Sequence, residues 1–210
     1  MSTRLNRLRE LFRASKQYVR DSPPLKWTFR VLYWSPLYMA FVHYGYTIKY
    51  VNGRSMQPTL NPNSSLGKDL VLFDRVSTKI RHEYKRDDVV ALYSPINPRL
   101  MLVKRIIALP GDIVKTLPPY PIKEVVIPPG HVWVEGDEPF HSEDSNWFGP
   151  VSQGLIESKL THILLPWDRF GPLDGVFKRT PQRGRNWSAQ SDEFQRKKKR
   201  EVRVTPNPEE

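Results

Sequence analysis

The chain has 210 residues, enough for one domain with its own hydrophobic core, and no cysteine, which excludes disulfides, thiolate metal sites and cysteine nucleophiles. The net charge of +11 lies in residues 1–30 and 176–210, while residues 31–175 hold equal numbers of basic and acidic side chains. Because a nucleic-acid-binding fold carries positive charge on its folded surface, no nucleic-acid partner is predicted. The sequence also has no HExxH motif, phosphate-binding glycine loop or Cys/His cluster, so no metal and no cofactor are predicted.

The N-terminal segments predict an association with a membrane. Residues 1–26 place basic side chains among apolar ones at spacings near three and four, typical of an amphipathic helix on an anionic membrane or of a mitochondrial address; an ordinary solvated helix fits equally well. Residues 27–48 are predicted as a transmembrane anchor, with a buried core helix as the alternative because Pro36 interrupts them. The basic residues before the anchor favour an N-terminus on the cis side, with the rest of the chain across the membrane.

The remaining sequence predicts a mainly β domain over residues 49–175, followed by a disordered basic tail over residues 176–210. The tail contains too few apolar residues to build a core. In the domain, short β-branched and apolar runs between turn-forming residues predict strands at 70–76, 88–93, 102–109, 131–136 and 161–166.

Three segments of the domain are candidates for chemistry. Ser55 lies in a turn after a flexible glycine, and residues 136–150 form a polar, turn-rich stretch. Between them, Lys104 shares one face of a predicted strand with Leu102 and Ile106, and an apolar surround lowers the pKa of an amine. Such a lysine can act as general base for a serine hydroxyl. Taken singly, the three segments are equally explained as a turn serine, an edge-strand lysine and a solvated loop.

Together, the three segments resemble the type I signal peptidase family, whose ordered boxes are matched by Ser55-Met56-Gln57-Pro58-Thr59-Leu60, by Lys104-Arg105 with Pro110-Gly111-Asp112, and by Gly136-Asp137 with Ser142-Glu143-Asp144-Ser145. The resemblance implies an antiparallel β domain that works as a serine endopeptidase, with Ser55 as nucleophile and Lys104 as general base. It also implies that Ser142 orients the lysine and that Asp144 stabilises the loop. Structural roles are implied for Arg105, which pairs with Asp137, and for Asp112.

The sequence departs from the family pattern at two positions that support the site. Gly53 stands where many bacterial members have a serine that donates to the oxyanion hole, which leaves the Ser55 backbone N–H as the expected donor. Asn146 stands where many members have an arginine, and this weakens the expected pairing with Asp144.

Within the family, residues 144–151 are similar to the mitochondrial inner membrane members. That resemblance implies a single-pass protein of the mitochondrial inner membrane whose catalytic domain faces the intermembrane space. It implies precursor polypeptides with sorting signals as substrates. It also implies a heterodimer with a homologous catalytic subunit.

Three other interpretations of the sequence are open. A self-cleaving repressor requires a DNA-reading helical motif, and residues 1–50 offer an aromatic apolar stretch instead. A triad of Ser55, His141 and Asp144 has suitable residue types but leaves the lysine segment unexplained. A membrane-tethered scaffold with a vestigial site is the third, because Gly53 and Asn146 lack the family's donors.

Overall fold

A computed structural model describes residues 23–62, 68–173 and 186–207. The chain divides into two compact units, Met1–His43 and Tyr44–Glu210. The basic amphipathic segment predicted over residues 1–26 lies largely outside the described residues.

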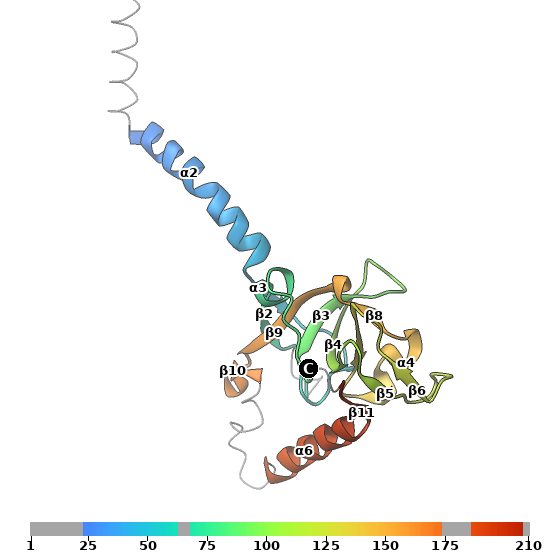
Figure 1. The fold of residues 1–210 in the computed structure, drawn as a ribbon. Helices are drawn as coiled ribbons and strands as arrows, with labels where there is room; N and C mark the ends of the chain where they lie inside the picture. Colours follow the sequence, from blue (N-terminus) through green and yellow to red (C-terminus); the bar gives the residue numbers. More distant parts are fainter. Residues whose placement is uncertain (1–22, 63–67, 174–185, 208–210) are drawn as a thin grey trace, which may run out of the picture. The chain divides into compact units, whose positions relative to one another are not determined.

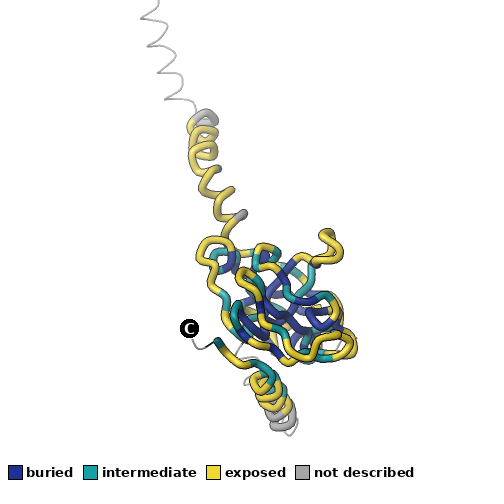
Figure 2. Tube along the Cα trace, turned by 45° about the vertical axis from the view of Figure 1, so that its right-hand side comes forward, coloured by how far each residue is buried: buried dark blue, intermediate teal, exposed yellow. Residues whose placement is uncertain are grey.

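Helix α2 (Pro23–Tyr44) occupies most of the segment that the sequence predicts as a membrane anchor, and residues 26–41 of it are exposed except for half-buried Ser35 (Figure 2). The predicted anchor is wrong at its C-terminal end, because residues 46–48 belong to strand β1 (Tyr46–Tyr50). Apolar and polar side chains alternate there with the period of two that a strand requires. Within the described part of the chain, none of the helices combines the length and the apolar character needed to cross a membrane.

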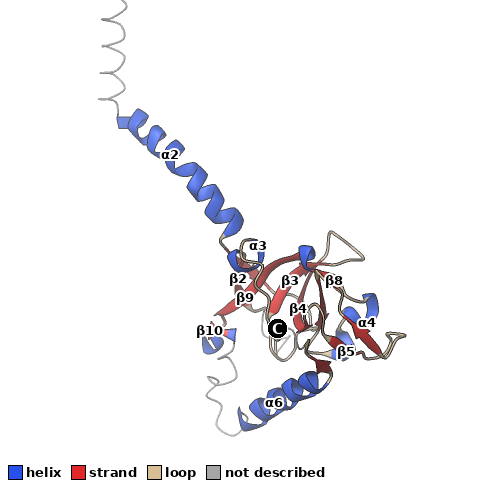
Figure 3. Cartoon of the chain, viewed as in Figure 1, coloured by secondary structure: helices blue, strands red, loops and turns tan. Residues whose placement is uncertain are grey.

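The second unit is built on an antiparallel sheet of eight strands, which confirms the predicted mainly β fold (Figures 1 and 3). Strand β10 (Gly171–Pro172) pairs with β9, off the main path. Along the main path the order is β1, β2 (Leu70–Asp74), β9 (Ile156–Leu165), β3 (Val89–Tyr93), β4 (Met101–Ala108), β7 (His131–Glu135) and β8 (Val151–Ser152). The five predicted strands all occur, although β9 begins five residues before the predicted 161–166.

The central strands are covered on both faces, because alternate residues of β3 belong to two separate core clusters. On β3, Val89 packs with Phe73 in one cluster, while its neighbour Val90 packs with Ile106 and Val134 in another. Burial on both faces makes β3 and β4 firm supports for a side chain that projects from them.

Short helices and a small second sheet surround the main sheet. The second sheet has the order β11 (Val204–Thr205), β5 (Ile113–Lys115) and β6 (Glu124–Val126). The helical segments are α3 (Val76–Lys79), η1 (Pro139–His141), α4 (Ser145–Phe148), η2 (Gln153–Leu155), η3 (Trp167–Arg169) and α6 (Asn186–Val202).

The prediction of a disordered tail is wrong for residues 186–207. They form helix α6 and strand β11, and β11 pairs with β5 through Val204 opposite Val114. The low apolar content of the tail excludes a separate core, but it does not exclude attachment through charge. The tail is instead fastened by charge, since Arg200 and Arg203 bind carboxylates of the domain.

Candidate active site

Ser55 lies in the turn that follows β1, where two buried apolar residues fix the backbone. Met56 and Leu60 both lie in the core, and the Leu60 N–H donates to the Met56 carbonyl over 2.8 Å. Ser55 itself is half-buried, and its carbonyl accepts a hydrogen bond from the Glu138 N–H at 3.0 Å. The turn is therefore tied on one side to the core and on the other to the segment that follows β7.

Lys104 is buried in the middle of β4, only 2% exposed, on the face that it shares with Leu102 and Ile106. Its Nζ donates to Ser142 Oγ at 2.8 Å, and Ser142 Oγ in turn donates to Asp144 Oδ2 at 2.7 Å. Burial lowers the pKa of Lys104, opposed by the negative charges of Asp144, Glu143 and Asp137. The Lys104 amine is therefore fixed in position, and a larger fraction of it is neutral than for a lysine in water. A general base requires both.

Gly136 is the point at which these two segments meet. A Cβ atom added there would lie less than 3.0 Å from both the Ser142 hydroxyl and the Ser55 carbonyl oxygen. The backbone of Ser55 and the pair formed by Ser142 and Lys104 are thus near neighbours. Among the described residues, no hydrogen bond joins the Ser55 hydroxyl to the Lys104 amine; catalytic hydrogen bonds often tighten only when substrate binds.

Arg105 points away from Lys104 and forms a two-bond fork with Asp137. Arg105 Nε donates to Oδ1 at 2.8 Å and Nη2 donates to Oδ2 at 2.6 Å, while Thr59 Oγ1 also donates to Oδ2 at 2.5 Å. Burial alone raises the pKa of Asp137, but the bonds from Arg105 and Thr59 outweigh it and hold that pKa below its usual value. The ion pair fixes the start of the loop after β7 against β4.

Asp112 closes the turn after β4. It is fully buried, and Arg86 forks onto it with bonds of 2.9 and 2.7 Å. It also accepts from the Leu109 N–H at 2.8 Å and the Asn207 N–H at 3.0 Å. Burial raises its pKa, and these bonds reverse the direction and keep the carboxylate ionised.

Asn146 links three groups around the loop that carries Ser142. Its Oδ1 accepts from the Leu117 N–H at 2.8 Å, and its Nδ2 donates to Glu135 Oε1 and to Asp144 Oδ1, each at 3.1 Å. Asp144 also caps α4 by accepting from the Asn146 N–H at 3.0 Å. Both buried carboxylates are therefore held through one amide.

Gly53 and His141 lie apart from this cluster. Gly53 is exposed with φ of 99°, a backbone conformation that side chains disfavour, and this accounts for a glycine rather than a serine there. His141 is exposed, while Asp144 Oδ2 is engaged by Ser142 and by the Gly136 N–H at 3.0 Å. The alternative triad of Ser55, His141 and Asp144 thus lacks geometric support.

Sequence reasoning missed three residues of this cluster: Gly136, Glu135 and Arg203. Gly136 belongs to the Gly136-Asp137 box, where the sequence alone gives it no separate role. Glu135 is the last residue of β7, inside the predicted strand 131–136, and its sequence position is that of an ordinary polar residue. Arg203 lies in a basic run whose composition gives no hint of a buried partner.

The chain matches known proteins over most of its length. The family described as signal peptidase, peptidase S26, matches residues 25–118. Mitochondrial inner membrane protease subunit 2 of Schizosaccharomyces pombe is 48% identical over 142 residues, which cover 67% of this chain and 77% of the relative. The protein of the same name from Saccharomyces cerevisiae is 41% identical over 164 residues, covering 77% and 89%.

A further relative is mitochondrial inner membrane protease subunit 1 of S. pombe, 38% identical over 131 residues that cover 60% of this chain and 81% of the relative. The predicted resemblance to signal peptidases, and to their mitochondrial inner membrane members, is confirmed by these matches. The chain belongs to the signal peptidase family, peptidase S26.

Proposed function

We propose that this peptidase-family chain is a serine endopeptidase that removes signal or sorting peptides from precursor proteins, with Ser55 as nucleophile and Lys104 as general base. The observation that carries the proposal is the buried Lys104 amine, which Ser142 holds beside the Ser55 turn. Burying a lysine ammonium costs free energy, so a buried lysine held in this way is a candidate for a chemical role.

The reaction is acyl transfer in two steps. The neutral Lys104 amine takes the Ser55 hydroxyl proton as Oγ attacks the scissile carbonyl carbon, and the resulting ammonium gives that proton to the leaving amine. A water molecule then attacks the acyl-enzyme ester while Lys104 accepts its proton; the bond to Ser55 Oγ breaks, the acid product leaves, and the ammonium returns the proton to Oγ. Because the pKa of Lys104 is lowered, activity should rise as the pH increases through that lowered pKa.

The oxyanion is assigned to the backbone N–H of Ser55, since Gly53 brings no side chain to the site. A donor of this kind contributes roughly 3 kcal/mol to transition-state stabilisation. The turn must therefore be rigid, and its ties to Met56, Leu60 and Glu138 supply that rigidity.

The proposed subcellular location comes from the relatives, whose names assign them to the mitochondrial inner membrane. The proposal is that the domain faces the intermembrane space, cleaves precursors with sorting signals there, and pairs with the homologous inner membrane protease subunit 1. A relative of that name is similar to this chain as well. An anchor limited to residues 27–44 of α2 is tested by alkaline extraction of membranes, from which an anchored chain stays in the pellet.

A non-catalytic scaffold is the second candidate. The missing bond between the Ser55 hydroxyl and Lys104 favours it, as does the absence of a side-chain donor at Gly53. A scaffold would stabilise the homologous subunit without using Ser55.

The test follows cleavage of purified intermembrane-space precursors by the full chain in detergent, with and without the homologous subunit. Ser55→Ala and Lys104→Ala should each lower cleavage by at least about a hundredfold, while Ser152→Ala, at an exposed serine on β8, should leave it unchanged. N-terminal sequencing of the products identifies the cut. Full cleavage by Ser55→Ala would reject the nucleophile and favour the scaffold.

A further inference from the structure

Arg203, in the segment between α6 and β11, is fixed on the domain that carries the proposed site. Directly after Arg203, strand β11 pairs with β5. Further along the chain, the Asn207 N–H donates to Asp112 at 3.0 Å. We infer that Arg203 is a positioning residue for the proposed peptidase reaction, acting on Lys104 through Glu135, Asn146, Asp144 and Ser142. The inference rests on the function proposed above.

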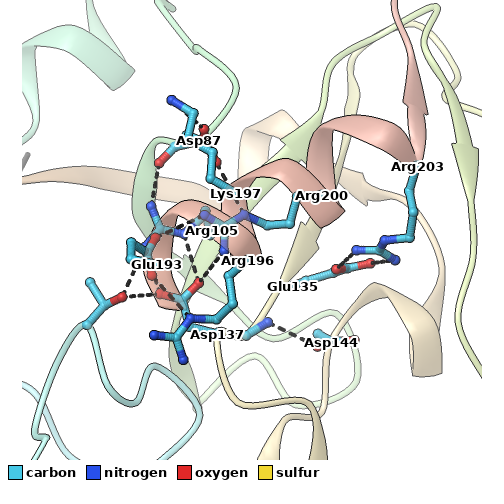
Figure 4. A network of polar contacts seen from close by, with 12 residues as sticks. Asp87, Arg105, Glu135, Asp137, Asp144, Glu193, Arg196, Lys197, Arg200 and Arg203 are labelled. Atoms are coloured by element: carbon cyan, nitrogen blue, oxygen red, sulfur yellow. Dashed lines mark hydrogen bonds and ion pairs between the residues drawn. The ribbon is translucent and has the colours of Figure 1, made fainter. Parts of the chain in front are cut away.

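The first step is the ion pair between Arg203 and Glu135 (Figure 4). Arg203 Nη1 donates to Glu135 Oε1 at 3.0 Å, and Nη2 donates to Oε2. The Glu135 side chain is only 7% exposed, and its other donors, Trp133 Nε1 at 3.0 Å and Asn146 Nδ2 at 3.1 Å, are neutral. A buried carboxylate requires a counter-charge, and Arg203 supplies it.

Arg105 does not take over this role. It lies directly opposite Glu135 in the pairing of β4 with β7, but its guanidinium forks onto Asp137. Removing Arg203 therefore leaves Glu135 next to a cation that is already engaged.

The second step runs from Glu135 to the proposed base through an unbroken series of hydrogen bonds. Asn146 Nδ2 bridges Glu135 and Asp144, with 3.1 Å to each. Asp144 accepts from Ser142 at 2.7 Å, and Ser142 accepts from Lys104 Nζ at 2.8 Å. Every group in the series is buried, so bulk water does not screen the change made at one end.

A second arginine, Arg200 of α6, contacts the loop that follows β7. Arg200 lies 3.4 Å from Asp87, 3.6 Å from Asp137 and 3.1 Å from Glu193. Figure 4 shows Arg200 and Arg203 reaching from the C-terminal segment to carboxylates at and after the end of β7. The C-terminal segment thus supports the loop at two places, Glu135 and Asp137.

The sign of the effect on Lys104 follows from the charges around it. Burial favours the neutral amine, and Asp144, Glu143 and Asp137 favour the ammonium. Loss of Arg203 leaves Glu135 as one more uncompensated negative charge and draws the Asn146 amide away from Asp144. Both changes favour the ammonium, so less neutral base remains at neutral pH.

The experiment compares full-length Arg203→Gln and Arg203→Lys with Lys199→Gln, which removes one charge from an exposed position on α6. One readout is kcat/KM from about pH 6 to 10. The other is the titration of Lys104 followed by NMR in protein with ¹³C-labelled lysine, assigned with Lys104→Arg. The titration needs no substrate, so it reports on the positioning even if the chain cleaves nothing.

For Arg203→Gln we expect Lys104 to titrate at a higher pH, with kcat/KM near pH 7 falling roughly tenfold and recovering at high pH. Arg203→Lys should restore part of the loss, and Lys199→Gln should match the wild type. An Arg203→Gln protein that is only less heat-stable, with an unchanged pH profile and Lys104 titration, would overturn the inference.

A double variant guards against simple misfolding. In Glu135→Gln with Arg203→Gln the buried charge is removed together with its counter-charge, so Lys104 should titrate closer to the wild-type pH than in Arg203→Gln alone. A double variant that shifts the titration as far as Arg203→Gln would show that the charge on Glu135 does not act on Lys104, and would also overturn the inference.

Discussion

Two sides of the loop that carries Ser142 are held by different forces. On the β4 side, Lys104 projects from a strand whose neighbours pack into apolar clusters on both faces of the sheet. On the α6 side, ion pairs link Lys197 and Arg200 of the helix, and Arg203 directly after it, to carboxylates of the domain. Moderate salt and pH change apolar packing little, whereas ion pairs respond to both. The proposed site therefore has one support that salt and pH affect little and one that both of them weaken.

The largest effect is expected where the two supports share a residue, at Asp137, which contacts Arg105 of β4 and Arg200 of α6. Asp137→Asn leaves the buried Arg105 guanidinium without its counter-charge and should lower the free energy of unfolding by about 3–5 kcal/mol. The measurement is urea unfolding at neutral pH, with Asp168→Asn at an exposed position as the control.

The same variant also gives a pH test. The folded-state pKa of Asp137 lies below its ordinary value, so the stability it contributes is present above the unfolded pKa and is lost as the pH falls toward the folded one. Asp137→Asn should flatten the acid side of the stability curve. An acid limb of unchanged slope would mean that other carboxylates control acid unfolding.

A second, smaller effect is expected at Gly136, where the turn that carries Ser55 meets the hydrogen-bonded pair of Ser142 and Lys104. Gly136→Ala forces a Cβ against the Ser55 carbonyl and the Ser142 hydroxyl. Overpacking of this kind costs about 1–3 kcal/mol, and a displacement near 1 Å at a site lowers cleavage about a hundredfold. Gly154→Ala is the matched control, since its Cβ would meet only Ser152 Oγ, at 3.6 Å. Normal cleavage by Gly136→Ala would show that the contact tolerates movement.

The same contrast explains what the sequence could predict. The five strands and the face that Lys104 shares with Leu102 and Ile106 follow from apolar periodicity, which is a local signal. Strand β1 was missed because its residues continue an apolar run that began in α2. The ordered C-terminal segment does not follow from the sequence, because its partners Glu135 and Asp137 lie far away in the chain. Charge pairing also produces no repeating pattern of residues that a sequence could reveal.

The smallest predicted effect tests the sensitive support alone. Arg200→Gln removes partly exposed contacts to Asp87 and Glu193 and a longer one to Asp137, so we expect a loss of about 1 kcal/mol that loosens α6 but leaves β4 unchanged. Hydrogen exchange should show faster exchange for α6 amides and unchanged exchange for β4 amides. High salt should produce the same pattern in the wild type, because screening weakens these pairs first. Lys198→Gln, on the same helix, is the charge-matched control. Faster exchange in β4 as well would mean that α6 is integral to the core rather than fastened to it by charge.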